Sequence, residues 1–229
     1  MADDLIALDA SAISATDENT AYFNSVPWCV ELLKDQSFIT IDTISRRGKD
    51  AIRDALFART LATAETMPAF MTQYKLVDLS QTNPTLPPDH FQPRIQEVRC
   101  FIALANGLNG YPGIMHGGMA ACIADEVTGL LGRHNYRLQV ENPRPGHDLP
   151  LWATVTGDLT VKYRRPVATG QVVQVRAWYN TNKLDRNKFT TKAVIQDSSG
   201  QVLCESIVTF VAIKPGKEGL FKPDRKIKL

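Results

Sequence analysis

The sequence lacks the patterns that mark metal, redox, membrane and nucleic-acid proteins. Its four cysteines form no C-x-x-C pair and no Cys/His cluster at metal-ligand spacing, so we expect reduced, mostly buried thiols in an intracellular protein, and no bound metal. No window holds about 18 uncharged apolar residues, which predicts that no helix spans a membrane. Acidic and basic residues are mixed along a chain of formal charge +2, and no basic run is interleaved with aromatics. Nucleic acid is therefore not an expected partner.

The two ends of the sequence carry little targeting information. The first twenty residues are acidic and have no basic n-region, long apolar stretch or Arg-rich face, so we expect neither a signal peptide nor a transit peptide. The last five residues, RKIKL, end in Lys-Leu but have Ile where the peroxisomal tripeptide S-K-L has a small residue, which is a weak peroxisomal signal. The expected location is cytoplasmic.

The length and composition favour one sizeable core rather than two domains, since the chain has 229 residues of which 44% are apolar. Residues 1–94 are expected to form a mainly helical extension: a loose tail, a helical stretch divided by Pro27, a second helix capped by Asp50, and a proline-rich loop over 80–93. Residues 95–215 form the predicted core domain, and 216–229 a basic tail.

The predicted core has one long helix and several strands. Residues 97–107 alternate as a strand and are followed by a turn rich in glycine. A helix is expected from His116 to near Gly132, opened by Gly117 and Gly118. Three or four alternating segments follow it, over 152–167, 171–182, 187–198 and 201–213. A single apolar helix and an antiparallel sheet must bury each other, which predicts an α+β fold.

Two adjacent carboxylates, Asp125 and Glu126, interrupt this otherwise uncharged helix. A lone buried carboxylate costs several kcal/mol unless it is paired, hydrogen-bonded or protonated, so each needs a reason to be there. At about 100° per residue the two acids lie on different faces, with Glu126 beside Met119 and Leu130. They therefore do not form one catalytic dyad, and at least one should face a cleft or a partner subunit.

The stretch GLNGYPGIMHGGMAACIADEVTG resembles the H-G-G-x6-D signature of the hotdog-fold acyl-thioesterases, in their phenylacetyl-CoA thioesterase-like branch. A second segment, LTVKYRRPVATG, is similar to that family's strand motif ending in Y-x-R-P-x3-G. The resemblance covers about 125 residues, and it implies a hotdog fold in which an antiparallel sheet wraps a long central helix. The proline-interrupted extension also resembles uncharacterised fungal thioesterase-like proteins, some of which accompany secondary-metabolite pathways.

The resemblance assigns catalytic roles to four residues of this sequence. Asp125 would act as general base on water or as nucleophile on the thioester carbonyl, and the N–H of Gly117 would stabilise the oxyanion. A Gly-Gly helix start leaves free donors at the positive end of the helix, which supports that role on physical grounds. His116 would hold either the loop or the carbonyl oxygen. Thr156, ten residues before the proline of the strand motif, would position water if the strand is ungapped; otherwise it is an ordinary strand residue.

Six further residues are candidates for substrate binding. Some relatives carry Asn or Gln six residues before the motif histidine, where this chain has Gly110, so Asn109 would replace it only with a rearranged loop. Glu126 either pairs with a cation such as Arg133 across a dimer or takes part in chemistry. The remaining candidates are the helix-start glycine and three basic residues that form either a solvated surface or a phosphate site: Gly118, Lys162, Arg164 and Arg165.

The favoured function is hydrolysis of an acyl-CoA or acyl-carrier-protein thioester, without a metal or redox cofactor. CoA or phosphopantetheine would enter as part of the substrate. Two alternatives stay open: a non-catalytic acyl-binding hotdog protein, and a hotdog dehydratase or hydratase, whose Asp/His or His/Glu motifs we do not find in the sequence. The resemblance also implies a homodimer or a dimer of dimers.

Overall fold

The computed structural model describes residues 18–46, 54–78, 86–87, 89–144, 148–149 and 154–213. Its main feature is a seven-stranded antiparallel sheet with the strand order β1-β2-β3-β7-β8-β9-β6. The strands are β1 (Phe38–Ile41), β2 (Phe70–Leu76), β3 (Ile95–Leu104), β6 (Thr154–Tyr163), β7 (Gln171–Tyr179), β8 (Lys188–Gln196) and β9 (Val202–Ala212). A short hairpin of β4 (Asn109–Tyr111) and β5 (Ile114–Met115) lies outside this sheet.

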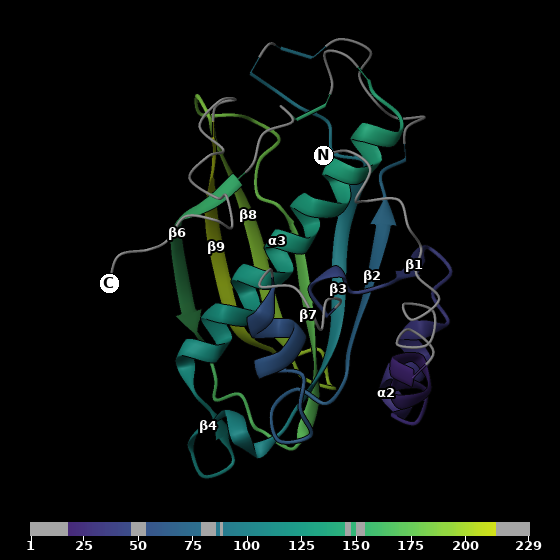
Figure 1. Cartoon of the computed structure of the whole chain (residues 1–229), viewed down its shortest axis with the longest axis vertical. Helices are drawn as coiled ribbons and strands as arrows, with labels where there is room; N and C mark the ends of the chain where they lie inside the picture. The colour runs from purple at the N-terminus through teal and green to yellow at the C-terminus, as the bar shows by residue number, and fades with distance from the viewer. Residues whose placement is uncertain are drawn as a thin grey trace.

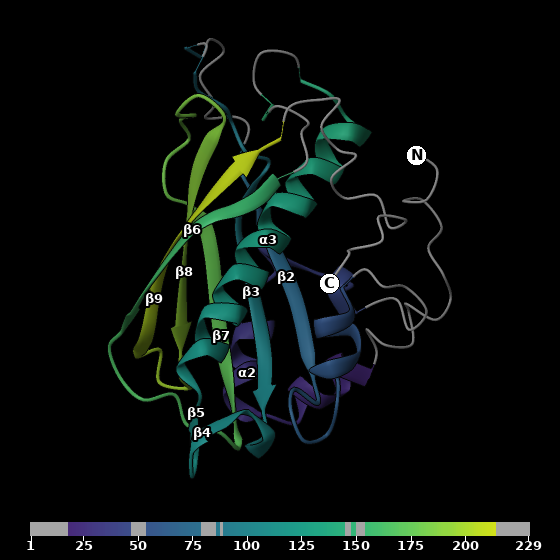
Figure 2. The same cartoon turned by 60° about the vertical axis from the view of Figure 1, so that its left-hand side comes forward.

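The sheet curves around one long helix, α3 (Gly117–Glu141), which crosses its concave face (Figures 1 and 2). Alternate residues of each strand face the helix, because successive side chains of a strand point to opposite sides. The strand β6 forms one edge of the sheet and lies beside α3. This arrangement confirms the predicted α+β hotdog fold.

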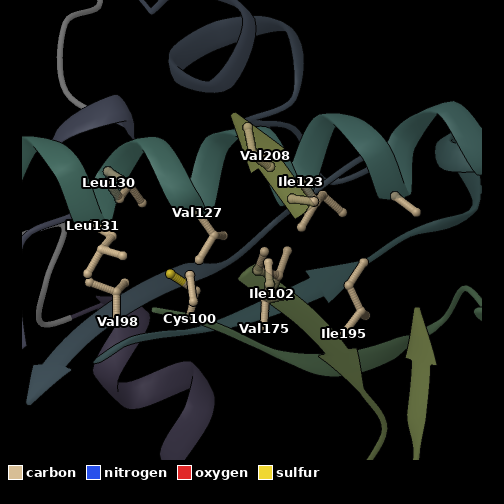
Figure 3. Close-up of a cluster of buried hydrophobic side chains, with 14 of the residues drawn as sticks. Val98, Cys100, Ile102, Ile123, Val127, Leu130, Leu131, Val175, Ile195 and Val208 are labelled. Carbon is tan, nitrogen blue, oxygen red and sulfur yellow. The ribbon is translucent and has the colours of Figure 1, made fainter. Parts of the chain in front are cut away.

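Aliphatic side chains join α3 to the middle of the sheet (Figure 3). Ile123 and Val127 on the helix are fully buried above Cys100 and Ile102 of β3. Burying one such side chain contributes about 1.5–3 kcal/mol, so the contact between α3 and the sheet stabilises the domain. Further members of the same cluster come from α3 and the central strands: Val98, Leu130, Leu131, Val175, Ile195 and Val208.

The helix is longer than the sequence predicts, because Gly132 does not end it. No described atom lies within 4 Å of a Cβ placed on Gly132, and its backbone is not left-handed as it would be at a typical glycine C-cap. The chain continues in helix to Glu141, and this added part is anchored by Asn135. The Oδ1 atom of Asn135 accepts hydrogen bonds from the N–H groups of Arg94 (2.8 Å) and Ile95 (3.0 Å) where β3 begins.

The expected helical extension contributes two strands to the sheet. Pro27 divides the first helical stretch as predicted, into residues 18–24 and α2 (Pro27–Leu33). The strands β1 and β2, however, pair with each other and with β3, so part of the region expected to be mainly helical belongs to the main sheet. The helix expected after Asp50 is described only from residue 54, and it includes a short π-helical segment, η3 (Leu56–Thr60).

The two sides of the sheet are covered by different parts of this region. The helix α2 packs on the outer face, where its residues meet Met71, Phe101 and Val172. The segment η3 packs on the inner side, where Phe57 and Leu61 join the main core. Several expected features lie outside the described residues: the N-terminal tail, the Asp50 cap, half of the proline-rich loop and the basic C-terminal tail. No helix in the described part of the chain has the length and apolarity needed to cross a membrane.

Candidate active site

The start of α3 presents a backbone donor. His116 is the N-cap residue, and its Nδ1 atom accepts a hydrogen bond from the N–H of Gly118 (3.0 Å). The next N–H, of Met119, donates to the carbonyl of His116 (2.9 Å). No acceptor in the described part of the chain receives the N–H of Gly117. Of the two glycines expected to offer donors, Gly117 therefore has its N–H open, whereas that of Gly118 is already engaged.

The ring of His116 is fixed by its surroundings. Since Nδ1 accepts from Gly118, the proton of the neutral ring lies on Nε2, which makes that atom a donor. The ring also packs against Gly110, where an added Cβ would lie 3.0–3.3 Å from His116 atoms. The absence of a side chain at Gly110 leaves the room that the His116 ring occupies.

A pocket of about 620 Å³ opens beside this helix start. Its wall includes the β4–β5 hairpin, the first turn of α3, Tyr163 at the end of β6, and Arg164 and Arg165 directly after that strand. The hydroxyl of Tyr163 donates to the carbonyl of Gly117 (2.8 Å) and ties β6 to the helix start. Tyr163 belongs to the quoted Y-x-R-P motif, but the sequence gives no reason to expect this contact.

The carboxylate of Asp125 is held from the edge strand. The Thr156 hydroxyl on β6 donates a 2.7 Å hydrogen bond to Oδ1 of Asp125. The other carboxylate oxygen, Oδ2, accepts no hydrogen bond from any residue that the structure describes. A shift in the strand register lies between Thr156 and Asp158, so β6 is not regular beside this contact.

Glu126 lies on another side of the helix and has different neighbours. Burial raises its pKa above the ordinary value, while the Ser45 hydroxyl and the Arg133 guanidinium act in the opposite direction. The pairing of Glu126 with Arg133 across a dimer, expected from the sequence, stays a prediction. Within the chain, Arg133 makes two hydrogen bonds to Asp54, of 2.7 and 3.0 Å. Glu126 therefore faces the extension rather than Asp125 and Thr156.

The other substrate-binding candidates are spread over the surface. Asn109 accepts a hydrogen bond from the hydroxyl of Thr169 (2.6 Å) through its Oδ1 atom, at the base of the hairpin. Arg164 lines the pocket and forms an exposed pair with Glu205 (3.1 Å). Arg165 lines the same pocket. Lys162 does not line it and lies opposite Glu205 in the pairing of β6 with β9.

The predicted residues thus gather at two places along α3. His116, Gly117, Arg164 and Arg165 surround the pocket at the helix start, whereas Asp125 and Thr156 meet farther along the helix. Asp125 follows Gly117 by eight positions, which corresponds to about 12 Å along the helix at about 1.5 Å per residue.

Comparison with known proteins gives one family. Residues 112–204 match the family model described as the thioesterase superfamily. The chain is also similar to verlamelin biosynthesis protein B from Lecanicillium sp., with 32% identity over 161 residues, which is 64% of this chain and 67% of that protein.

Solved structures give low-scoring matches. The crystal structure of a thioesterase superfamily protein is 22% identical, with a TM-score of 0.42, and covers 63% of this chain and 56% of its own. The chain thus spans just over half the length of that protein. A hypothetical thioesterase from Streptococcus pneumoniae, solved with coenzyme A, is 18% identical with a TM-score of 0.41, covering 52% of this chain and 79% of its own. At these scores the fold assignment rests on the strand order and register of this chain.

Proposed function

Because the chain belongs to the thioesterase superfamily, we propose that it hydrolyses an acyl thioester, with Asp125 as the residue that acts on water or on the carbonyl. The observation that carries this proposal is the hydrogen bond from Thr156 to Asp125. It holds the half-buried carboxylate of Asp125 in an orientation that leaves one oxygen available.

The geometry of Asp125 suits a base. Thr156 occupies Oδ1, so Oδ2 is the atom that would take a proton from water, or would attack the thioester carbon directly. The departing thiolate needs no strong acid, because the pKa of a thiol is about 8.5. The chemistry requires neither a metal nor a redox cofactor.

The start of α3 suits the developing oxyanion. The open N–H of Gly117 lies at the positive end of a 25-residue helix, where backbone donors stabilise negative charge. The Nε2–H of His116 would be a second donor toward the same carbonyl, or toward the rest of the substrate.

The separation of the two groups argues for a dimer. A reacting carbonyl must lie about 3 Å from the oxyanion donor while the base acts on water beside it, and the two lie about 12 Å apart along one helix. Two copies whose α3 helices run antiparallel about a two-fold axis would bring Gly117 of each copy toward Asp125 of the other. We therefore propose a homodimer with two composite sites.

The lining of the pocket suits a thioester whose carrier bears a phosphate group. Arg164 and Arg165 line the same wall as His116 and Gly117, so a carrier phosphate could meet a cation while the thioester lies at the helix start. Both CoA and the phosphopantetheine of an acyl-carrier protein fit this description. The cytoplasmic location expected from the sequence stays a prediction.

The test is a thiol-release assay with short, long, aromatic and dicarboxylic acyl-CoAs and with acylated carrier protein. We expect thiol release from at least one class. Binding of these thioesters without release of thiol from any of them would instead identify a non-catalytic acyl-binding protein.

A further inference from the structure

The edge strand β6 contains a β-bulge beside the proposed base. Its residues pair regularly with β9 on both sides of one position: Asp158 lies opposite Thr209, and Thr156 lies opposite Phe210. Gly157, between them, has no partner on β9. It is the extra residue that defines a bulge.

The bulge decides which face Thr156 occupies. In a regular strand Gly157 would lie opposite Phe210, and Thr156 would lie opposite Val211 on the outer face, away from α3. With the bulge, Thr156 lies opposite Phe210 and faces the helix, while Val155 lies opposite Val211 and faces outward. Hydrophobic patterning alone favours the regular register, because that register would turn Val155 inward.

A glycine is needed at the bulge because of space. A Cβ added to Gly157 would lie 2.6 Å from Cγ2 of Val211, which is closer than real side chains approach. Val211 is β-branched and has few rotamers with which to move aside. The backbone of Gly157 is not left-handed, so conformational freedom is not the reason.

We propose that Gly157 is a positioning residue for the hydrolysis: it allows the bulge that turns Thr156 toward α3, where the Thr156 hydroxyl orients Asp125. This inference rests on the proposed function. The base itself lies on the helix, but its orientation then depends on a glycine of the neighbouring strand.

The test is a double-mutant cycle on kcat and KM with the thioester identified by the thiol-release assay. Gly157→Ala should lower kcat about tenfold or more with little change in KM, the loss expected for one hydrogen bond to a charged group. In a Thr156→Val background, Gly157→Ala should cause no further loss, because the two changes remove the same interaction. Thr156→Ser, which keeps the hydroxyl, should recover most of the rate lost in Thr156→Val.

The matched control changes Val211, the residue on β9 that a side chain at position 157 would strike. Val211→Ala removes the methyl group that an alanine at 157 would strike, so Gly157→Ala should have an effect of less than about twofold in this background. The same comparison carries the test if the single variant does not fold. Melting temperatures of all variants separate a loss of folding from a loss of positioning.

Three results would overturn the inference. The first is a wild-type kcat in Gly157→Ala. The second is a further tenfold loss of kcat when Gly157→Ala is added to Thr156→Val. The third is an equal loss of kcat from Gly157→Ala with and without Val211→Ala. Asp125→Asn, assayed in parallel, separates the inference from the proposed function. If that variant keeps wild-type activity, the proposed base is wrong; if it is inactive while Gly157→Ala is normal, only the role of Gly157 is wrong.

Discussion

The hydroxyl of Thr156 lies 2.7 Å from Oδ1 of Asp125, although 31 residues of sequence separate the two. One residue comes from the middle of the central helix and the other from an edge strand beside it. The hydrogen bond leaves the second carboxylate oxygen open. This contact gives Asp125 a hydrogen-bond partner, which is a physical reason for a half-buried carboxylate on the helix.

The open N–H of Gly117 leads to a test of the oxyanion site. Gly117 is the first helical residue, where proline is tolerated, and His116 has φ −59° and ψ 133°, which a residue before proline readily adopts. Gly117→Pro should therefore delete the donor and leave the helix in place. We expect kcat to fall about 100-fold or more, as for loss of an oxyanion donor.

Gly117→Ala is the matched control for that variant. It keeps the N–H and adds only a Cβ about 3.4 Å from the ring of Tyr163. A smaller loss of kcat in the alanine variant, with similar far-ultraviolet circular dichroism for both, would support the role of the N–H. Equal rates for Gly117→Pro and Gly117→Ala would contradict it.

The composite site predicts complementation between inactive subunits. In a mixture of Asp125→Asn and Gly117→Pro chains, each mixed dimer has one site with both intact groups. Random assembly should restore about a quarter of wild-type activity, since about half of the dimers are mixed and each has one working site. The measurement uses co-expressed chains with different tags, and each variant alone serves as the control. No recovery in mixed dimers would contradict a site shared between subunits.

The surroundings of Glu126 predict a pH-dependent stability. Burial raises the pKa of Glu126 above its ordinary value of 4.5, so the folded chain holds this proton at pH values where the unfolded chain has lost it. Its contribution to stability is thus fully present below pH 4.5 and is lost as the pH rises through the folded-state pKa. Glu126→Gln cannot ionise and should escape this loss.

The comparison is of melting temperatures for wild type and Glu126→Gln from pH 4 to pH 8. As the pH rises above about 4.5, the melting temperature of Glu126→Gln should increase relative to that of the wild type. A difference that stays constant over this range would mean that Glu126 titrates normally in the folded protein.

The sequence predicts this fold well where a pattern is local. The glycine pair correctly places the start of α3, and alternation correctly places β3 and the last four strands. It fails at Gly132, where a glycine in an ordinary helical conformation does not end the helix. It also misses β1 and β2, whose assignment depends on pairing with β3, a distant segment of the chain.

The candidate site was predictable only in part, for a similar reason. The family motif points to Asp125, Gly117 and His116, but Thr156 can be reached only by counting along an ungapped strand. The bulge at Gly157 is invisible in the alternation, because it makes the register depart from that pattern. The bond between Arg133 and Asp54 joins residues 79 positions apart, which no sequence spacing indicates.

The measurement that tests the central claim most directly is made on Asp125→Asn, with hydrolysis rate and thioester affinity determined on the same preparation. The proposed mechanism predicts a loss of about 100-fold or more in the rate of thiol release, as for removal of a general base or nucleophile, with affinity changed only a few-fold. An unchanged rate in this variant, with the protein folded and the thioester bound, would contradict the assignment of Asp125.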